Sequence, residues 1–106
     1  MSVKTFPLGD DKHVLQFDVN AVCEAEEVFQ EDISSVLENK DRMKQSRTIR
    51  VLLWAALLEH HPEITLRDVG KLIEARGMDA IGKSIIGALH VAYPDKINAD
   101  GTPKKK

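Results

Sequence analysis

IRVLLWAALL, residues 49–58, is the most apolar run of this chain and sets what the other segments have to cover. On a helix it divides into two stripes that lie on nearly opposite sides. A helix that is apolar on all sides must be covered on all sides, so it either runs through the middle of a small fold or offers one stripe to a partner. The less certain stripe contains Val51, Trp54 and Leu58. The stripe that we predict to face the core contains Ile49, Leu52, Leu53, Ala56 and Leu57.

Length and charge favour one small domain. The chain has 106 residues and a formal net charge of -2, and a chain of this length builds one core and not two. Three of its 15 basic residues are C-terminal lysines, so the body is more acidic than the whole and would repel a phosphate backbone. We expect residues 1–94 to form a single globular domain and the polar residues 95–106 to be a disordered tail.

The sequence also favours a cytoplasmic location without membrane association. Arg50 and Glu59 bracket the longest apolar run, which is far shorter than the roughly 18 to 20 residues of a membrane span. The first residues lack the apolar segment of a secretory signal. The single cysteine, Cys23, cannot form an internal disulfide, in agreement with a reducing compartment.

Turn and capping residues divide the chain into a hairpin and a series of helices. Strand-like runs over residues 3–8 and 13–17 flank a Gly-Asp-Asp-Lys reversal, which predicts a β-hairpin. Asp18 and Thr65 are placed to cap helices at their N-terminal ends. The expected fold class is α+β, mainly α: an N-terminal β-hairpin followed by four to five helices packed around the central apolar helix. We expect these helices at residues 19–30, 33–37, 45–61, 65–77 and 79–93, with a mobile loop over 38–46.

No set of residues predicts catalysis, a metal site or a cofactor site. His60 and His61 are adjacent and lack the histidine four residues away that a helical metal site uses. Cys23 lies on the acidic side of the first helix, and because the reactive form is an anionic thiolate, acidic neighbours count against a catalytic cysteine. We therefore predict that the protein is not an enzyme and takes no cofactor.

Nucleic-acid binding is the alternative that a different pattern supports. Residues 65–89 can form two short helices around Gly77, the outline of a helix-turn-helix regulatory module. The second of these helices, however, has Lys83 as its one basic residue and lacks the side chains that read base edges. A basic cluster precedes and enters the central helix, and it can instead neutralise the acidic first helix. Its members are Lys40, Arg42, Lys44, Arg47 and Arg50.

Apolar side chains in excess of one small core favour a protein-binding function. An apolar patch with an aromatic residue at its centre is typical of partner interfaces. For Trp54 the alternative is an ordinary core position under the hairpin and the first helix. The candidate partner-binding residues are Val51, Trp54, Leu58, Ile86 and Tyr93.

Three stretches resemble one family. They are FDVNAVCEAEEVF at residues 17–29, LLWAALLEHHPEITLRDVGKLIEARG at 52–77, and IIGALHVAYP at 85–94. With the hairpin before them they are similar to the small tail assembly chaperones encoded upstream of the tape measure gene in phage and gene-transfer-agent tail clusters. The likeness spans residues 5–94 and rests on an Asn-Ala-x-Cys-x-x-Glu-Glu-x-Phe pattern and on Leu-Trp-Ala-x-Leu followed by His-Pro-Glu.

The resemblance implies a binding protein without catalytic activity. Chaperones of this family are expected to keep the long, helical tape measure protein soluble, to bring in tail tube protein, and to be absent from the finished virion. Tape measure and tail tube proteins are therefore the expected partners in the bacterial cytoplasm, with homo-oligomers also expected. The alternation of Gly and Ile in the last helix and the lysine tail depart from the family pattern.

Overall fold

The fold is a two-stranded hairpin followed by helices that pack around one of their number, as a computed structural model describes it for residues 5–8 and 12–98. The predicted class, α+β and mainly α, is confirmed. In chain order the elements are β1 (Phe6–Pro7), β2 (Val14–Leu15), α1 (Val19–Phe29), α2 (Ile33–Glu38), the 3-10 helix η1 (Arg42–Lys44), α3 (Ser46–Leu57), α4 (Leu66–Arg76) and α5 (Met78–Ala92).

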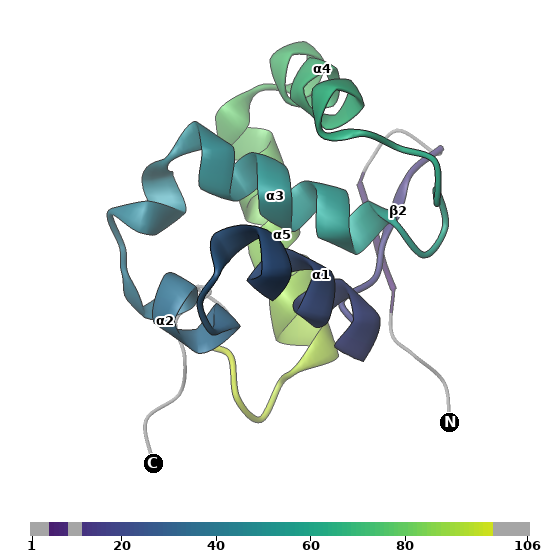
Figure 1. Ribbon diagram of the computed structural model, residues 1–106. Helices are drawn as coiled ribbons and strands as arrows, with labels where there is room; N and C mark the ends of the chain where they lie inside the picture. The colour runs from purple at the N-terminus through teal and green to yellow at the C-terminus, as the bar shows by residue number, and fades with distance from the viewer. Residues whose placement is uncertain (1–4, 9–11, 99–106) are drawn as a thin grey trace.

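Helix α3 is the centre of the packing. It lies against α1, α4, α5 and β2 (Figure 1). Every residue of the predicted core stripe is buried, and Val51 of the other stripe is only 5% exposed. Trp54 and Leu58 are half-buried. The helix therefore runs through the middle of the fold and is covered on both sides for most of its length.

The C-terminal end of α3 comes earlier than the predicted end at His61. The Leu58 N–H turns back to the Ala55 carbonyl at 3.4 Å, and the carbonyl of Ala56 accepts the Gln16 N–H at 2.9 Å. A helix leaves its last carbonyls without intrahelical partners. The chain that follows β2 supplies one of the missing donors, so a tertiary contact accompanies the end of α3.

The predicted hairpin is present as an antiparallel pair in which Phe6 faces Leu15 and Pro7 faces Val14. The turn residues Gly9 to Asp11 lie outside the described residues. The hairpin packs against α5, where the Phe6 ring occupies the space that a side chain on Gly87 would need. Gly87 therefore permits the close approach of strand and helix.

Capping residues act where the sequence predicts. The Asp18 carboxylate accepts the Ala21 N–H at 2.8 Å, at the start of α1. Thr65 and Asp68 exchange two hydrogen bonds of 3.1 Å, which form a capping box at the start of α4. Gly77 joins α4 to α5 with a φ of 92°, in the region that favours glycine.

Two segments are more structured than predicted. The expected loop over residues 38–46 contains η1, where Arg42 pairs with Glu31. The predicted domain ends at Pro94, but Ile97 is 6% exposed and belongs to the core, so packing continues to that residue. The rest of the predicted tail, residues 99–106, lies outside the described residues. None of the helices within the described ranges is long and apolar enough to cross a membrane.

Candidate binding groove

A groove of about 950 Å³ lies between α1, α2 and the chain that leaves α5. We call it the α1–α2–α5 groove. Helix α1 turns two faces to different neighbours: Ala21 and Ala25 are buried, whereas Val19 and Val22 line the groove. The remaining apolar side chains of its wall come from α2, α5 and the segment after α5, and they are Ile33, Leu37, Leu89 and Ile97.

Exposure along α1 marks the lip of this groove. Val19 is 74% exposed, although valine is usually buried. Val28, at the other end of the helix, is 46% exposed and lies outside the groove. The two residues are the large hydrophobic side chains most open to solvent among the described residues. Val19 thus adds apolar surface to a concave, mostly apolar site, the usual form of a binding site.

Helix α2 is held in place by a side chain of α1. The Glu26 carboxylate accepts the backbone N–H of Ile33 at 2.8 Å, the first residue of α2. An acidic group at a helix N-terminus is favourable because that end carries a partial positive charge. This bond sets the position of the wall that Ile33 and Leu37 form, and it occupies one oxygen of Glu26.

The third wall is a turn stabilised from within α5. The Ile97 N–H donates to the Tyr93 carbonyl at 2.8 Å, and the Ile97 carbonyl is 2.8 Å from Nδ1 of His90. Tyr93 lines the groove. Burial raises the pKa of the Tyr93 phenol, and the nearby Asp18 and Cys23 raise it further. The hydroxyl therefore stays protonated at neutral pH and can donate a hydrogen bond to a bound partner.

The charged residues around the groove are mostly acidic. Glu26, Glu38 and Asp95 line it, against Lys96 alone on the basic side. Cys23 lines it too and is exposed. A mostly apolar interior with a mostly acidic rim is suited to binding apolar surface with a basic border.

Only one of the five predicted partner-binding residues lies in this groove. Tyr93 lines it. Val51 is buried and Leu58 and Ile86 are half-buried elsewhere. Trp54 packs against the core and donates from Nε1 to the Ile64 carbonyl at 3.1 Å, so much of its surface serves the monomer.

The sequence-based interpretation missed the groove because its walls come from three separate elements. A local signal did exist in the first helix. Val19, Val22, Cys23 and Glu26 follow the i, i+3, i+4, i+7 spacing of one helical face. That face lies beside the one formed by Ala21 and Ala25, and periodicity cannot tell which apolar face is covered.

The arginines of the basic cluster, Arg42, Arg47 and Arg50, line a second hollow, and Arg42 also makes an ion pair within the chain. Arg42 pairs with Glu31 just after α1, and its guanidinium lies 5.5 Å from the centre of the Phe29 ring. Arg42 thus makes an intramolecular ion pair next to α1, as the intramolecular alternative for the basic cluster supposes. Arg47 and Arg50 line the same hollow of about 440 Å³.

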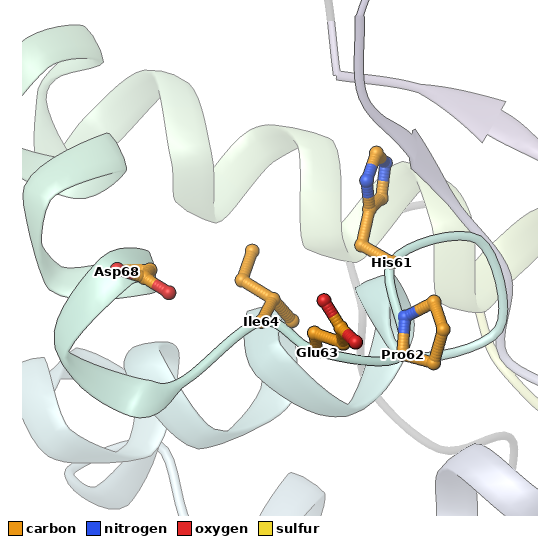
Figure 2. Close-up of a pocket in the computed structure, with 5 residues that line it drawn as sticks. All are labelled: His61, Pro62, Glu63, Ile64 and Asp68. Carbon is orange, nitrogen blue, oxygen red and sulfur yellow. The ribbon is translucent and has the colours of Figure 1, made fainter.

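A third hollow, of about 390 Å³, lies on the loop between α3 and α4 (Figure 2). Its lining comes from one local stretch, with His61, Pro62, Glu63 and Ile64 on the loop and Asp68 further along on α4. The Asp68 carboxylate caps the helix. Bonds from the backbone and side chain of Thr65, with Lys71 nearby, hold the pKa of Asp68 below its ordinary value. The one acidic residue that α4 contributes to this hollow therefore serves as a helix cap.

The two histidines that follow α3 contact residues on either side of β2. The rings of His13 and His61 lie 4.9 Å apart, and Nε2 of His60 is 2.9 Å from the Gln16 side-chain oxygen. Within the described part of the chain, no three His, Cys, Asp or Glu side chains are grouped to hold a metal ion.

Comparison of the chain with protein-family models, with curated proteins and with solved structures finds no match.

Proposed function

We propose that this protein is a tail assembly chaperone, a non-catalytic factor that keeps the tape measure protein of a phage or gene transfer agent soluble and assists assembly of the tail tube. The observation that carries the proposal is the α1–α2–α5 groove, whose walls are mostly apolar and whose lip includes the exposed Val19. A long helical protein exposes apolar stripes before assembly, and a groove of this kind can shield such a stripe. The sequence resemblance over residues 5–94 supports the same role.

The proposed partners are the tape measure protein and the tail tube protein, and the proposed place of action is the bacterial cytoplasm. Because the chaperone shields surface that the finished tail buries, it leaves before the virion is complete. Self-association fits a factor that must coat a long chain at many points.

Co-expression tests the proposal. The wild-type chain should raise the soluble fraction of the tape measure protein encoded by the same tail cluster. A Val19→Ser/Val22→Ser variant should lose most of this effect because it removes apolar contact from the groove. Val28→Ser is the matched control, since Val28 is exposed on the same helix but outside the groove, and it should act like wild type.

Duplex DNA is the discriminating ligand for the helix-turn-helix alternative. Helices α4 and α5 meet at Gly77 as that outline requires, but Lys83 remains the one lysine or arginine of α5. We expect no sequence-specific binding to duplex DNA. Failure to solubilise the tape measure protein, together with salt-dependent binding to duplex DNA, would refute the chaperone proposal.

A further inference from the structure

Charge on this protein is separated between two sides of α1. Of the charged residues that line the α1–α2–α5 groove, Glu26, Glu38 and Asp95 are acidic and Lys96 is basic, and helices α1 and α2 contain no lysine or arginine. Arg42, Arg47 and Arg50 line instead the separate hollow at the C-terminal end of α1. A partner helix that enters the groove therefore meets more carboxylates than ammonium groups.

From this arrangement we infer that the groove selects an amphipathic helix whose apolar stripe is bordered by lysine or arginine, and discriminates against one bordered by glutamate. The inference rests on the proposed chaperone function and adds the chemistry of the partner segment. Burial of one apolar stripe in the groove leaves the flanking positions of the helix over its rim. Glu38 and Asp95 are exposed rim residues, and they can pair with those flanking positions.

The size of the groove agrees with a helix. Two turns of helix, as a cylinder of ~10 Å diameter and ~11 Å length, occupy roughly 850 Å³. The groove holds about 950 Å³. Because a helix sinks only one face into an open groove, more than two turns of a partner can share this volume. The residues that meet the walls would follow the i, i+3, i+4, i+7 spacing.

Two synthetic helical peptides with the same Leu and Ala stripe, one bordered by lysine and one by glutamate, test the inference. Binding to the full chain is followed by fluorescence anisotropy of labelled peptide. Exposed ion pairs are individually weak, so we expect the lysine peptide to bind about tenfold more tightly than the glutamate peptide. This preference should decrease as salt is added. Equal affinity of the two peptides would overturn the inference.

Matched variants locate the effect. Glu38→Gln/Asp95→Asn should reduce the preference for the lysine peptide by about threefold. This variant keeps Glu26, the residue that positions α2. Glu63→Gln/Glu74→Gln makes the same change in net charge at exposed residues outside the groove and should leave the preference intact. An equal loss in both variants would assign the preference to net charge and overturn the groove as its source.

The outcomes separate this inference from the function on which it rests. If neither peptide binds while the chain still solubilises the tape measure protein, the partner chemistry is wrong and the chaperone function stands. If both peptides bind equally and Val19→Ser/Val22→Ser weakens both, the groove binds helices without charge selection. Dimers that the same variant dissociates, with no peptide binding, would assign the groove to a second copy of the chain.

Discussion

The contact between the hairpin and α5 can be tested with a single methyl group. A Cβ added at Gly87 would lie 2.6 Å from Cζ and 2.8 Å from Cε2 of the Phe6 ring, closer than packed carbon atoms come. Gly82 lies in the same helix and has no neighbour within 4 Å of such a Cβ. We predict that Gly82→Ala stabilises the protein and that Gly87→Ala destabilises it.

The magnitude follows from two opposing effects. Replacing glycine by alanine inside a helix stabilises by about 0.5–1 kcal/mol, and Gly82→Ala should gain this amount. At Gly87 the same gain is opposed by an overpacking cost of about 1–3 kcal/mol, because the Phe6 ring and its strand must move. The two variants should therefore differ by about 1–3 kcal/mol in the free energy of unfolding.

Urea unfolding followed by circular dichroism measures this difference. With a denaturant slope of about 1 kcal/mol/M, the low end for small proteins, this difference corresponds to a shift of about 1–3 M in the urea midpoint. A Phe6→Ala background provides the control, since removing the ring should turn Gly87→Ala into a stabilising change of the same size as Gly82→Ala. If Gly87→Ala stabilises the protein while Phe6 is present, or if the Phe6→Ala background changes nothing, the packing of the hairpin on α5 is refuted.

Four further predictions concern hydrogen bonds and titration. Trp54→Phe should lower the free energy of unfolding by about 1 kcal/mol, because it breaks the hydrogen bond to the Ile64 carbonyl, and Trp54→Ala should lower it by about 3 kcal/mol. Urea unfolding measures both changes, and an unchanged midpoint in both variants would show that Trp54 is free for a partner. Thr65→Ala should cost about 1 kcal/mol through loss of the α4 cap, seen as a fall of about 4–8 °C in Tm. The pKa of Asp68 is lowered in the folded state. The stabilisation that its carboxylate gives to the folded protein is therefore complete above the ordinary pKa of 3.8 and is lost as the pH falls through the pKa of the folded state. The difference in unfolding free energy between wild type and Asp68→Asn should shrink over that pH range. The pKa of Tyr93 is raised above its ordinary value of 10.0, so its phenolate absorbance should appear above pH 10.0. The free energy of unfolding should decrease as the pH rises from 10.0 towards the pKa of Tyr93 in the folded protein. Tyr93→Phe should not show this decrease.

The local elements were predictable because their signals are local. Asp18 and the Thr65 capping box lie where they act, within three residues of the N–H groups that they bind. Gly77 separates two helices because its backbone has a positive φ, which ends a helix and which residues other than glycine rarely adopt. Such rules need only neighbours along the chain.

Four of the five predicted partner-binding residues lie outside the α1–α2–α5 groove, for a physical reason. An apolar stripe shows that a helix face needs cover, but not which segment covers it. Val51 is covered by the protein's own packing and Trp54 largely so. The exposed apolar surface lies on α1. It includes Val19, which in the sequence is simply the first residue of a helix and does not stand out.

The sequence by itself determined the helices, their capping residues, the hairpin and the central place of residues 49–58, because spacing and turn chemistry are encoded within a few residues. Tertiary structure alone decided three other features: the Gln16 contact at the end of α3, the packing of Ile97, and the α1–α2–α5 groove. Each depends on segments that are distant in the chain and adjacent in space. The groove exists because α2 and the chain after α5 stand beside one face of α1, and their relative placement is the outcome of packing the whole core.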